Sequence, residues 1–153
     1  MSTSLIWTAS SIDGLNARQL HDLLKLRIDV FVVEQRCAYA ELDGQDALPA
    51  TQHIFATDVK REVVAAARVL PADGALPVRI GRVVVRPSHR GTGLSKQLMN
   101  RVMDYCNEYH QKEDIELSAQ VGADGLYSAY GFKVISKDYL DDGIPHRDMR
   151  LSR

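Results

Sequence analysis

The chain has 153 residues, 45% of them hydrophobic, and nineteen Lys and Arg against twenty Asp and Glu leave a formal net charge of -1. This length and composition are typical of one globular domain spanning residues 1–153, and they exclude a wholly disordered chain. Without a basic excess we expect no nucleic-acid partner, and with no long apolar run we expect no membrane-spanning segment.

The start of the chain and its two cysteines bear on the compartment in which it works. The first ten residues, MSTSLIWTAS, lack the basic region and long apolar run of a secretory signal. Cys37 and Cys106 form no CxxC pair and are too few for a disulfide framework. We therefore expect inert thiols in a reducing cytoplasm. The histidines are scattered without the spacing of metal ligands, so no metal site is predicted.

Taken in order, the hydrophobic pattern switches between strand and helix periods. Strands are predicted at 4–8, 53–56, 63–70, 78–86, 115–120, 132–135 and 146–151, and helices from Asn16, over 94–106 and over 123–130. The first helix is expected to weaken at Val32 and Val33 before a second short turn. Tight turns predict an antiparallel meander, and the strand-helix-strand step over 78–120 predicts a parallel crossover. The predicted fold class is α/β (α+β), a mixed sheet with helices on both faces.

Two polar connections are predicted as loops. Residues 37–51 carry Glu41, Asp43 and Asp46. These acids are either a solvated surface or part of a wall for a cationic acceptor, because long loops are often functional. The second loop is the stretch 138–146, DYLDDGIPH.

The stretch 80–106 organises the chain: a β-branched strand leads into a basic, glycine-bearing loop and an amphipathic helix. Gly91 and Gly93 let backbone amides approach a ligand at the helix N-terminus, where the helix dipole is positive. Cations flank this loop at Arg86, His89, Arg90 and Lys96. The arrangement predicts a polyanion site, most simply for a pyrophosphate. The Walker and GxGxxG patterns are absent, which leaves a nucleoside triphosphate site as a weaker alternative. An ordinary glycine-containing turn before a helix is the other alternative.

These residues resemble a known family. Arg90-Gly91-Thr92-Gly93-Leu94-Ser95 is similar to the Arg/Gln-x-x-Gly-x-Gly/Ala loop of the GNAT acetyltransferase superfamily, with Ser95 in place of the last small residue. Tyr127 precedes Gly131-Phe132 at the spacing of a tyrosine found in many members. The segments FVVEQ at 31–35, ELDGQD at 41–46, SAQ at 118–120 and DGIPH at 142–146 further resemble the ElaA-like acetyltransferases.

The resemblance implies a GNAT fold with acetyl-CoA as co-substrate and no metal. Its sheet of six to seven strands would be splayed at the central strand, with the pantetheine arm in the opening. The residues expected to bind acetyl-CoA are Val83, Val84, Val85, Arg90, Gly91, Thr92, Gly93, Leu94, Ser95, Lys96, Gln120 and Tyr130.

The implied activity is acetyl transfer to a primary amine of a small molecule or peptide, by direct attack on the thioester. Tyr127 is expected to protonate the departing thiolate. An ammonium must lose a proton before it attacks. The preferred proton acceptors are Glu34 and His146, ahead of Glu41, Glu116 and His53. A non-catalytic acyl-CoA-binding module is the alternative function, and exposed strand edges leave a homodimer open.

Overall fold

The computed structural model describes residues 4–153, and eight strands in this range form one mixed sheet. Residues 1–3, which begin the stretch used to predict the absence of a secretory signal, lie outside the described residues. The strand order is β1-β2-β3-β4-β5-β8-β6, and β7 also pairs with β8. The strands are β1 (Ile6–Ser10), β2 (Gln52–Thr57), β3 (Val63–Leu70), β4 (Val78–Val85), β5 (Ile115–Gln120), β6 (Lys133–Val134), β7 (Tyr139–Asp141) and β8 (Ile144–Leu151).

The helices are α1 (Ala17–Ile28), α2 (Leu94–Tyr109) and α3 (Asp124–Ser128), with 3-10 turns η1 (Ile12–Gly14), η3 (Gln45–Ala47) and η4 (Pro87–His89). The predicted helix start at Asn16 is confirmed. Asn16 Oδ1 accepts from the Gln19 amide at 2.8 Å, and Gln19 Oε1 accepts from the Asn16 amide at 3.0 Å. The predicted weakening at Val32 is wrong, because α1 runs directly into a π-helix, η2 (Asp29–Glu34). Such wide turns are frequent at functional sites.

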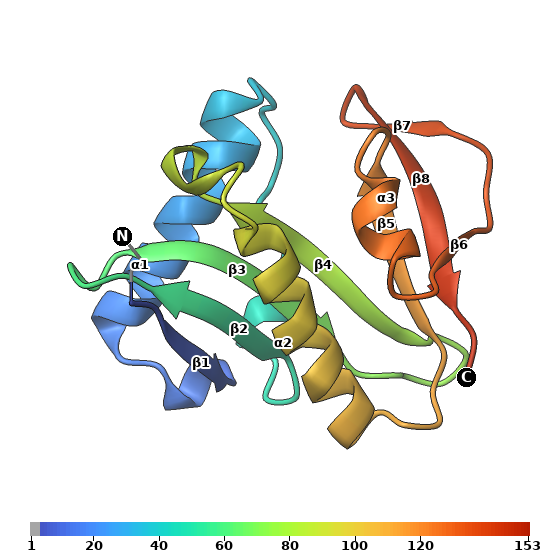
Figure 1. The fold of residues 1–153 in the computed structure, drawn as a ribbon, viewed down its shortest axis with the longest axis horizontal. Helices are drawn as coiled ribbons and strands as arrows, with labels where there is room; N and C mark the ends of the chain where they lie inside the picture. The colour runs from blue at the N-terminus through green and yellow to red at the C-terminus, as the bar shows by residue number, and fades with distance from the viewer. Residues whose placement is uncertain (1–3) are drawn as a thin grey trace.

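The two long helices cover opposite faces of the sheet (Figure 1). On one face α2 buries Leu98, Met99 and Val102 completely against strands β2 to β5. On the other face α1 buries Leu23 and Leu26 against β3 and β4. Each such side chain contributes roughly 1.5–3 kcal/mol by leaving water. None of the helices within residues 4–153 has the length and apolar character needed to cross a bilayer.

The sheet opens between its two central strands. Parallel pairing of β4 with β5 is limited to Val78, Arg79 and Ile80 opposite Ile115, Glu116 and Leu117. Beyond Ile80 the strands diverge, and β5 and β8 swing away from β4 with α3 (Figure 1). The predicted GNAT-type fold, with a splay at the central strand, is therefore confirmed.

The stretch predicted as a loop at 138–146 is a hairpin instead, which raises the strand number from the predicted six or seven to eight. Asp141 pairs with Ile144, and only Asp142 and Gly143 lie between them. Both turn residues have positive φ, 47° for Asp142 and 81° for Gly143. This is the type I′ geometry that Asp-Gly favours, because its twist matches that of the flanking strands. The turn brings Asp141 and Asp142 to the open end of the sheet.

Candidate active site

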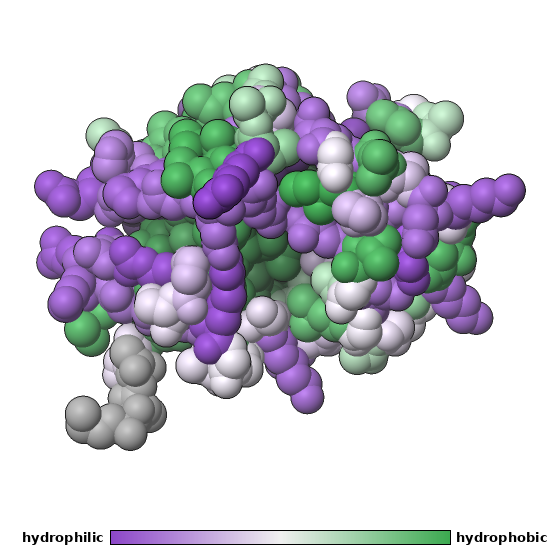
Figure 2. Space-filling model, turned by 90° about the horizontal axis from the view of Figure 1, so that it is seen from above, coloured by the Kyte–Doolittle hydropathy of each residue, from purple (hydrophilic) through white to green (hydrophobic). Residues whose placement is uncertain are grey.

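A cavity of about 640 Å³ lies where β4 and β5 separate. Its walls come from η2, β4, β5, α3 and the β7–β8 hairpin, and Figure 2 shows hydrophobic surface in the recess between hydrophilic side chains. Of the residues predicted to act at the site, those that line this cavity are Glu34, Val83, Val84, Val85, Arg90, Ser95, Gln120, Tyr127 and His146.

A bulge in β4 shapes the cavity floor. Arg82 and Val83 together stand opposite Ala67, because the register passes from Ala66–Val84 to Arg68–Gly81. The Arg86 amide donates to the Val64 carbonyl at 2.8 Å, so in an antiparallel ladder the backbone groups of Val85 and Val83 point away from β3. On that side β5 has already moved away. Val83 and Val85 therefore offer backbone amides to a ligand in the opening.

The glycine loop fits a phosphate group. Gly91 and Gly93 have φ of 75° and 83°, and a Cβ at either position would project into open space. The first helical hydrogen bond of α2 runs from the Gln97 amide to the Gly93 carbonyl at 3.2 Å. The amides of the first turn, including those of Ser95 and Lys96, therefore have no helical acceptor and can bind an anion. The Leu94 side chain is buried in the core, so only its backbone faces this site.

Glu34 and Arg90 form a bidentate ion pair beside this loop. Arg90 Nη1 and Nη2 donate to the two Glu34 carboxylate oxygens at 2.6 and 2.8 Å, and Arg90 Nε donates to the Val85 carbonyl at 3.3 Å. The hydrogen bonds from Arg90 lower the pKa of Glu34. A carboxylate held in its charged form is a weak proton acceptor. The Glu34 carboxylate instead fixes Arg90 against the end of β4.

Tyr127 lies at the other side of the cavity, on α3. It is 7% exposed and meets the Phe132 ring edge-to-face, with 6.5 Å between centroids. Burial raises the pKa of Tyr127 to about 12. The phenol therefore keeps its proton at neutral pH and can donate it to an anion in the cavity.

His146 has a defined tautomer. Its Nδ1 lies 2.7 Å from the Ile144 carbonyl oxygen, which can only accept, so Nδ1 carries the proton. Nε2 then keeps its lone pair. The Tyr139 ring lies at 25° to the imidazole plane, with 6.2 Å between centroids. His146 can therefore accept a proton at Nε2 from a group in the cavity.

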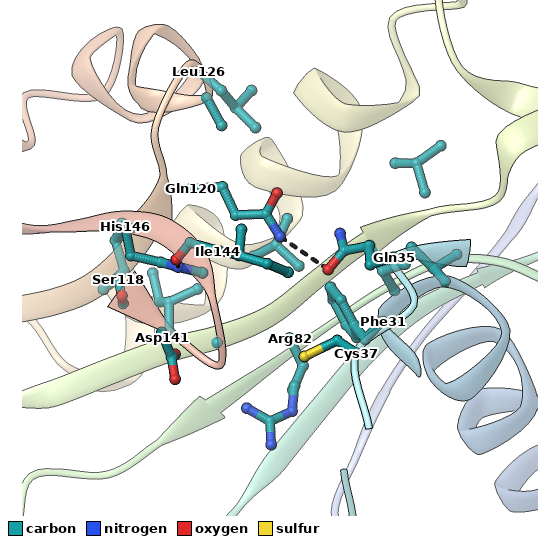
Figure 3. Close-up of a pocket in the computed structure, with 18 of the residues that line it drawn as sticks. Phe31, Gln35, Cys37, Arg82, Ser118, Gln120, Leu126, Asp141, Ile144 and His146 are labelled. Atoms are coloured by element: carbon teal, nitrogen blue, oxygen red, sulfur yellow. Dashed lines mark hydrogen bonds between the residues drawn. The ribbon is translucent and has the colours of Figure 1, made fainter. Parts of the chain in front are cut away.

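Two contacts link the walls of the cavity. Gln120 Nε2 on β5 donates to Gln35 Oε1 at 3.3 Å, and Cys37 Sγ contacts the Asp142 carbonyl at 3.4 Å. Figure 3 shows Gln120 and Gln35 meeting across the space, with His146 and Asp141 on one side and Cys37 on the other. Burial, with the charges of Asp142 and Asp141, raises the pKa of the Cys37 thiol. The thiol is therefore a poor nucleophile.

Comparison with known proteins decides the family. A family model described as an acetyltransferase (GNAT) domain matches residues 20–153. The chain belongs to the GNAT acetyltransferases. It is 40% identical to Protein ElaA of Escherichia coli (strain K12) over 144 residues, 94% of each chain. The predicted GNAT family and ElaA-like branch are thereby confirmed.

Solved structures agree with this assignment. The GNAT chain matches the crystal structure of an acyl-CoA N-acyltransferase from Pseudomonas aeruginosa with a TM-score of 0.90 and 40% identity, over 96% of this chain and 99% of that one. It matches the crystal structure of Escherichia coli ElaA with a TM-score of 0.90 and 36% identity over the same shares. The protein is an acyltransferase, and its family uses acyl-CoA. Residues 4–153 hold no group of three or more His, Cys, Asp or Glu placed to bind a metal.

The predicted acidic wall of the GNAT cavity is wrong. Glu41 and Asp46 are 4% and 6% exposed, and neither they nor Asp43 line the cavity. Arginines from three other elements neutralise them. Arg27 on α1 donates to Glu41 at 2.7 Å and to both Asp46 oxygens at 2.7 and 2.9 Å. Arg68 on β3 donates to Asp43 at 2.7 Å and to Asp46 at 3.1 Å, and Arg82 donates to Glu41 at 3.0 Å.

Other predicted residues also lie outside the cavity. His53 is buried with Nε2 against the Asp46 carbonyl at 3.1 Å, and Glu116 pairs with Arg150 at 2.7 Å. The Tyr130 hydroxyl donates to Asn100 Oδ1 at 2.5 Å and lies 3.2 Å from the Lys96 carbonyl, which ties the end of α3 to α2. Binding of acetyl-CoA by Tyr130, Lys96, Gly91, Thr92 and Gly93 stays a prediction.

Several residues that line the cavity were not predicted from the sequence. Arg82, Ser118, Asp141 and Asp142 all line the space. Only the two aspartates had a usable signal, since an Asp-Gly pair flanked by strand-like residues indicates a hairpin tip. The sequence around Arg82 carries no such signal, because its side chain acts through partners far away in the sequence.

Proposed function

We propose that this protein is an acetyl-CoA-dependent N-acetyltransferase that transfers the acetyl group to a primary amine by direct attack. The observation that carries this proposal is the opening between β4 and β5. It combines free β4 amides, a phosphate-binding helix start and a protonated buried phenol in one cavity. The chain is an acyltransferase, so the alternative of a non-catalytic acyl-CoA-binding module is set aside.

In the proposed complex the pyrophosphate of CoA lies on the amides of residues 91–96, with Arg90 beside them. The pantetheine arm follows β4 into the opening and takes the place of the missing strand neighbour. The Val83 and Val85 backbone groups bind this arm. An amide at this floor donates to the thioester oxygen, whose negative charge grows as the amine attacks. Gln120 faces the arm from β5.

Proton transfers are assigned from the geometry above. His146 Nε2 takes the proton of the incoming ammonium, directly or through a water, because its tautomer leaves that lone pair free. Glu34 is less suited to this role, since Arg90 holds it as a carboxylate, and we assign it to positioning Arg90. Tyr127 protonates the CoA thiolate as the tetrahedral intermediate collapses, and the second proton that the attacking nitrogen loses returns to the Tyr127 phenolate. Direct attack needs no acyl-enzyme, and Cys37, the cysteine that lines the cavity, has a thiol whose pKa is raised by burial.

The proposed acceptor is a cationic amine on a small molecule or peptide. Among the charged side chains that line the cavity, Glu34 is paired with Arg90, and Arg82 is paired with Glu41. Asp141 and Asp142 line the same cavity, and no ion pair to either carboxylate is found within residues 4–153. The hairpin tip therefore presents negative charge to an incoming ammonium.

Thiol release from acetyl-CoA in the presence of an amine panel tests the proposal. Tyr127→Phe removes the hydroxyl and keeps the ring packed on Phe132. The kcat should fall by about 10²-fold. This is the low end for general acid catalysis, because a thiolate already leaves readily. The dissociation constant of acetyl-CoA by calorimetry should stay within about threefold, because the ring is retained.

Arg90→Glu serves as the matched binding variant. It should weaken acetyl-CoA at least tenfold, since a charge-assisted contact contributes ~1.5–3 kcal/mol and a repulsion is added. Wild-type kcat in Tyr127→Phe with chemistry rate-limiting contradicts the acid role. Unchanged acetyl-CoA affinity in folded Arg90→Glu contradicts the binding site.

A further inference from the structure

The β4 bulge contains a backbone conformation that its sequence does not favour. Arg82 has a φ of 53°, in the left-handed region where glycine is the usual residue at the first position of such a bulge. A glycine would adopt this conformation without a steric penalty. The arginine at this position therefore suggests that its side chain holds the bulge.

That side chain contacts two carboxylates, the closer of which is the buried Glu41, while Arg82 Nη2 lies 3.5 Å from Asp43 Oδ2. Arg82 Nε donates to Glu41 Oε2 at 3.0 Å, and Arg82 Nη2 donates to the Glu41 backbone carbonyl at 3.3 Å. The guanidinium also lies over the Tyr39 ring, 5.7 Å from its centroid. The Tyr39 hydroxyl and Arg27 Nε both donate to the Glu41 carboxylate. Glu41 is thus fixed from three sides, and Arg82 is fixed by Glu41.

The anchor extends to the scaffold behind the sheet. Arg27 on α1, which donates to Glu41, also donates to Asp46 from both Nη atoms. Arg68 on β3 donates to Asp46 as well. Three arginines and three carboxylates join in one neutral cluster: Arg27, Arg68, Arg82, Glu41, Asp43 and Asp46. The cluster ties the bulge to α1, β3 and the 39–46 connection at once.

The bulge also decides which backbone groups face the cavity. Ile80, Val83 and Val85 contact the core on the α2 side, whereas Val84 contacts the core on the α1 side. Without the extra residue the alternation would put Val84 with Ile80 and turn Val83 and Val85 to the other face. Any movement of Arg82 is therefore passed to Val83, the next residue, whose amide faces the opening.

We infer that Glu41, acting through Arg82, is a positioning residue that sets the thioester-binding backbone of the β4 bulge. This rests on the proposed function, since it concerns the same acetyl-CoA site. Neither side chain needs to touch the reacting atoms. The arginine–carboxylate cluster thereby contributes to catalysis by positioning the β4 backbone. It does not act by attracting the acceptor with its charge.

Arg82→Gly tests the inference, because it keeps the left-handed backbone accessible and removes the side chain that anchors the bulge. Its kcat should fall about 10-fold to 100-fold, as expected when a reacting group is misplaced by about 1 Å, with the acetyl-CoA dissociation constant nearly unchanged. Arg79→Ala is the matched control, since Arg79 lies on the same strand and its guanidinium makes one hydrogen bond within residues 4–153, to the Pro71 carbonyl at 3.5 Å. It should retain the wild-type kcat. Glu41→Gln should lower kcat similarly, and the double variant no further, because both changes remove one anchor.

A spectroscopic readout separates this inference from the proposed function. Bound acetyl-CoA labelled with ¹³C at the thioester carbonyl should show a carbonyl stretch shifted to lower frequency in the wild type, and Arg82→Gly should lose that shift. This needs binding but no turnover. If the wild type binds acetyl-CoA, and Arg82→Gly keeps both the shifted band and the wild-type kcat, the inference is overturned. If the wild type does not bind acetyl-CoA, the proposed function fails first.

Discussion

Two acidic segments lie near the cavity, the connection with Glu41, Asp43 and Asp46 and the hairpin tip with Asp141 and Asp142. In sequence they look alike, since each is a polar stretch containing an Asp-Gly pair. In the structure Glu41 and Asp46 of the first segment are buried and all three of its acids pair with arginines, whereas the second segment is exposed and lines the cavity. The first holds the fold together, and the second is free to meet a ligand.

The difference teaches that the number of acids in a loop does not determine its role. What decides it is whether cations from other elements reach those acids. Arg27, Arg68 and Arg82 come from α1, β3 and β4, and the chain folds these elements around the 39–46 connection. Removing one partner of a buried ion pair costs far more than removing an exposed charge, because the remaining charge stays buried. The two segments should therefore respond to mutation in opposite ways.

The largest expected effect is on stability. Asp46→Asn leaves the buried guanidinium of Arg27 with only Glu41 as a charged partner, so the free energy of unfolding should fall by about 3–5 kcal/mol in urea denaturation. Asp142→Asn is the matched control at the hairpin and should change it by less than about 0.5 kcal/mol. Equal losses in the two variants would remove the distinction between the segments.

The next effect is on the acceptor. Replacing Asp141 and Asp142 together by Asn should raise KM for a cationic amine about tenfold and flatten its salt dependence, because two surface charges that attract the ammonium are lost. Asp43→Asn, measured where it is folded, should leave this KM within about threefold, since Arg68 already neutralises Asp43. A larger rise in KM for Asp43→Asn than for the hairpin variant would reverse the assignment.

A smaller effect concerns pH. Hydrogen bonds from Arg68 lower the pKa of Asp43, and the arginine partners Arg27 and Arg68 lower the pKa of Asp46 despite its burial. A carboxyl whose folded pKa lies below its unfolded value of about 3.9 stabilises the fold above that value. This contribution is lost as pH falls through the folded pKa. Unfolding free energies measured from about pH 5 to pH 2 should therefore decline, and Asp43→Asn should reduce the slope. A slope unchanged in that variant would contradict the contribution of Asp43.

Local patterns were enough to predict much of the fold. The Asn16 cap, the meander and the glycine loop before α2 depend on neighbouring residues, and each was found where the sequence indicated. The pairing of Glu34 with Arg90 could not be predicted, because 56 positions separate them and no local pattern reports the contact. The bulge at Arg82 was missed for the same reason, since an arginine carries no signal for positive φ. The hairpin tip was missed despite its Asp-Gly signal.

The central claim is that acetyl groups pass from acetyl-CoA to a cationic amine in the cavity between β4 and β5. The most direct measurement compares thiol release with two acceptors of equal length, 1,5-diaminopentane and 5-aminopentanoate. The wild type should acetylate the diamine with a kcat/KM at least about tenfold higher, because Asp141 and Asp142 attract its second ammonium and repel the carboxylate. Equal rates for the two acceptors, or faster acetylation of the aminopentanoate, would contradict the account.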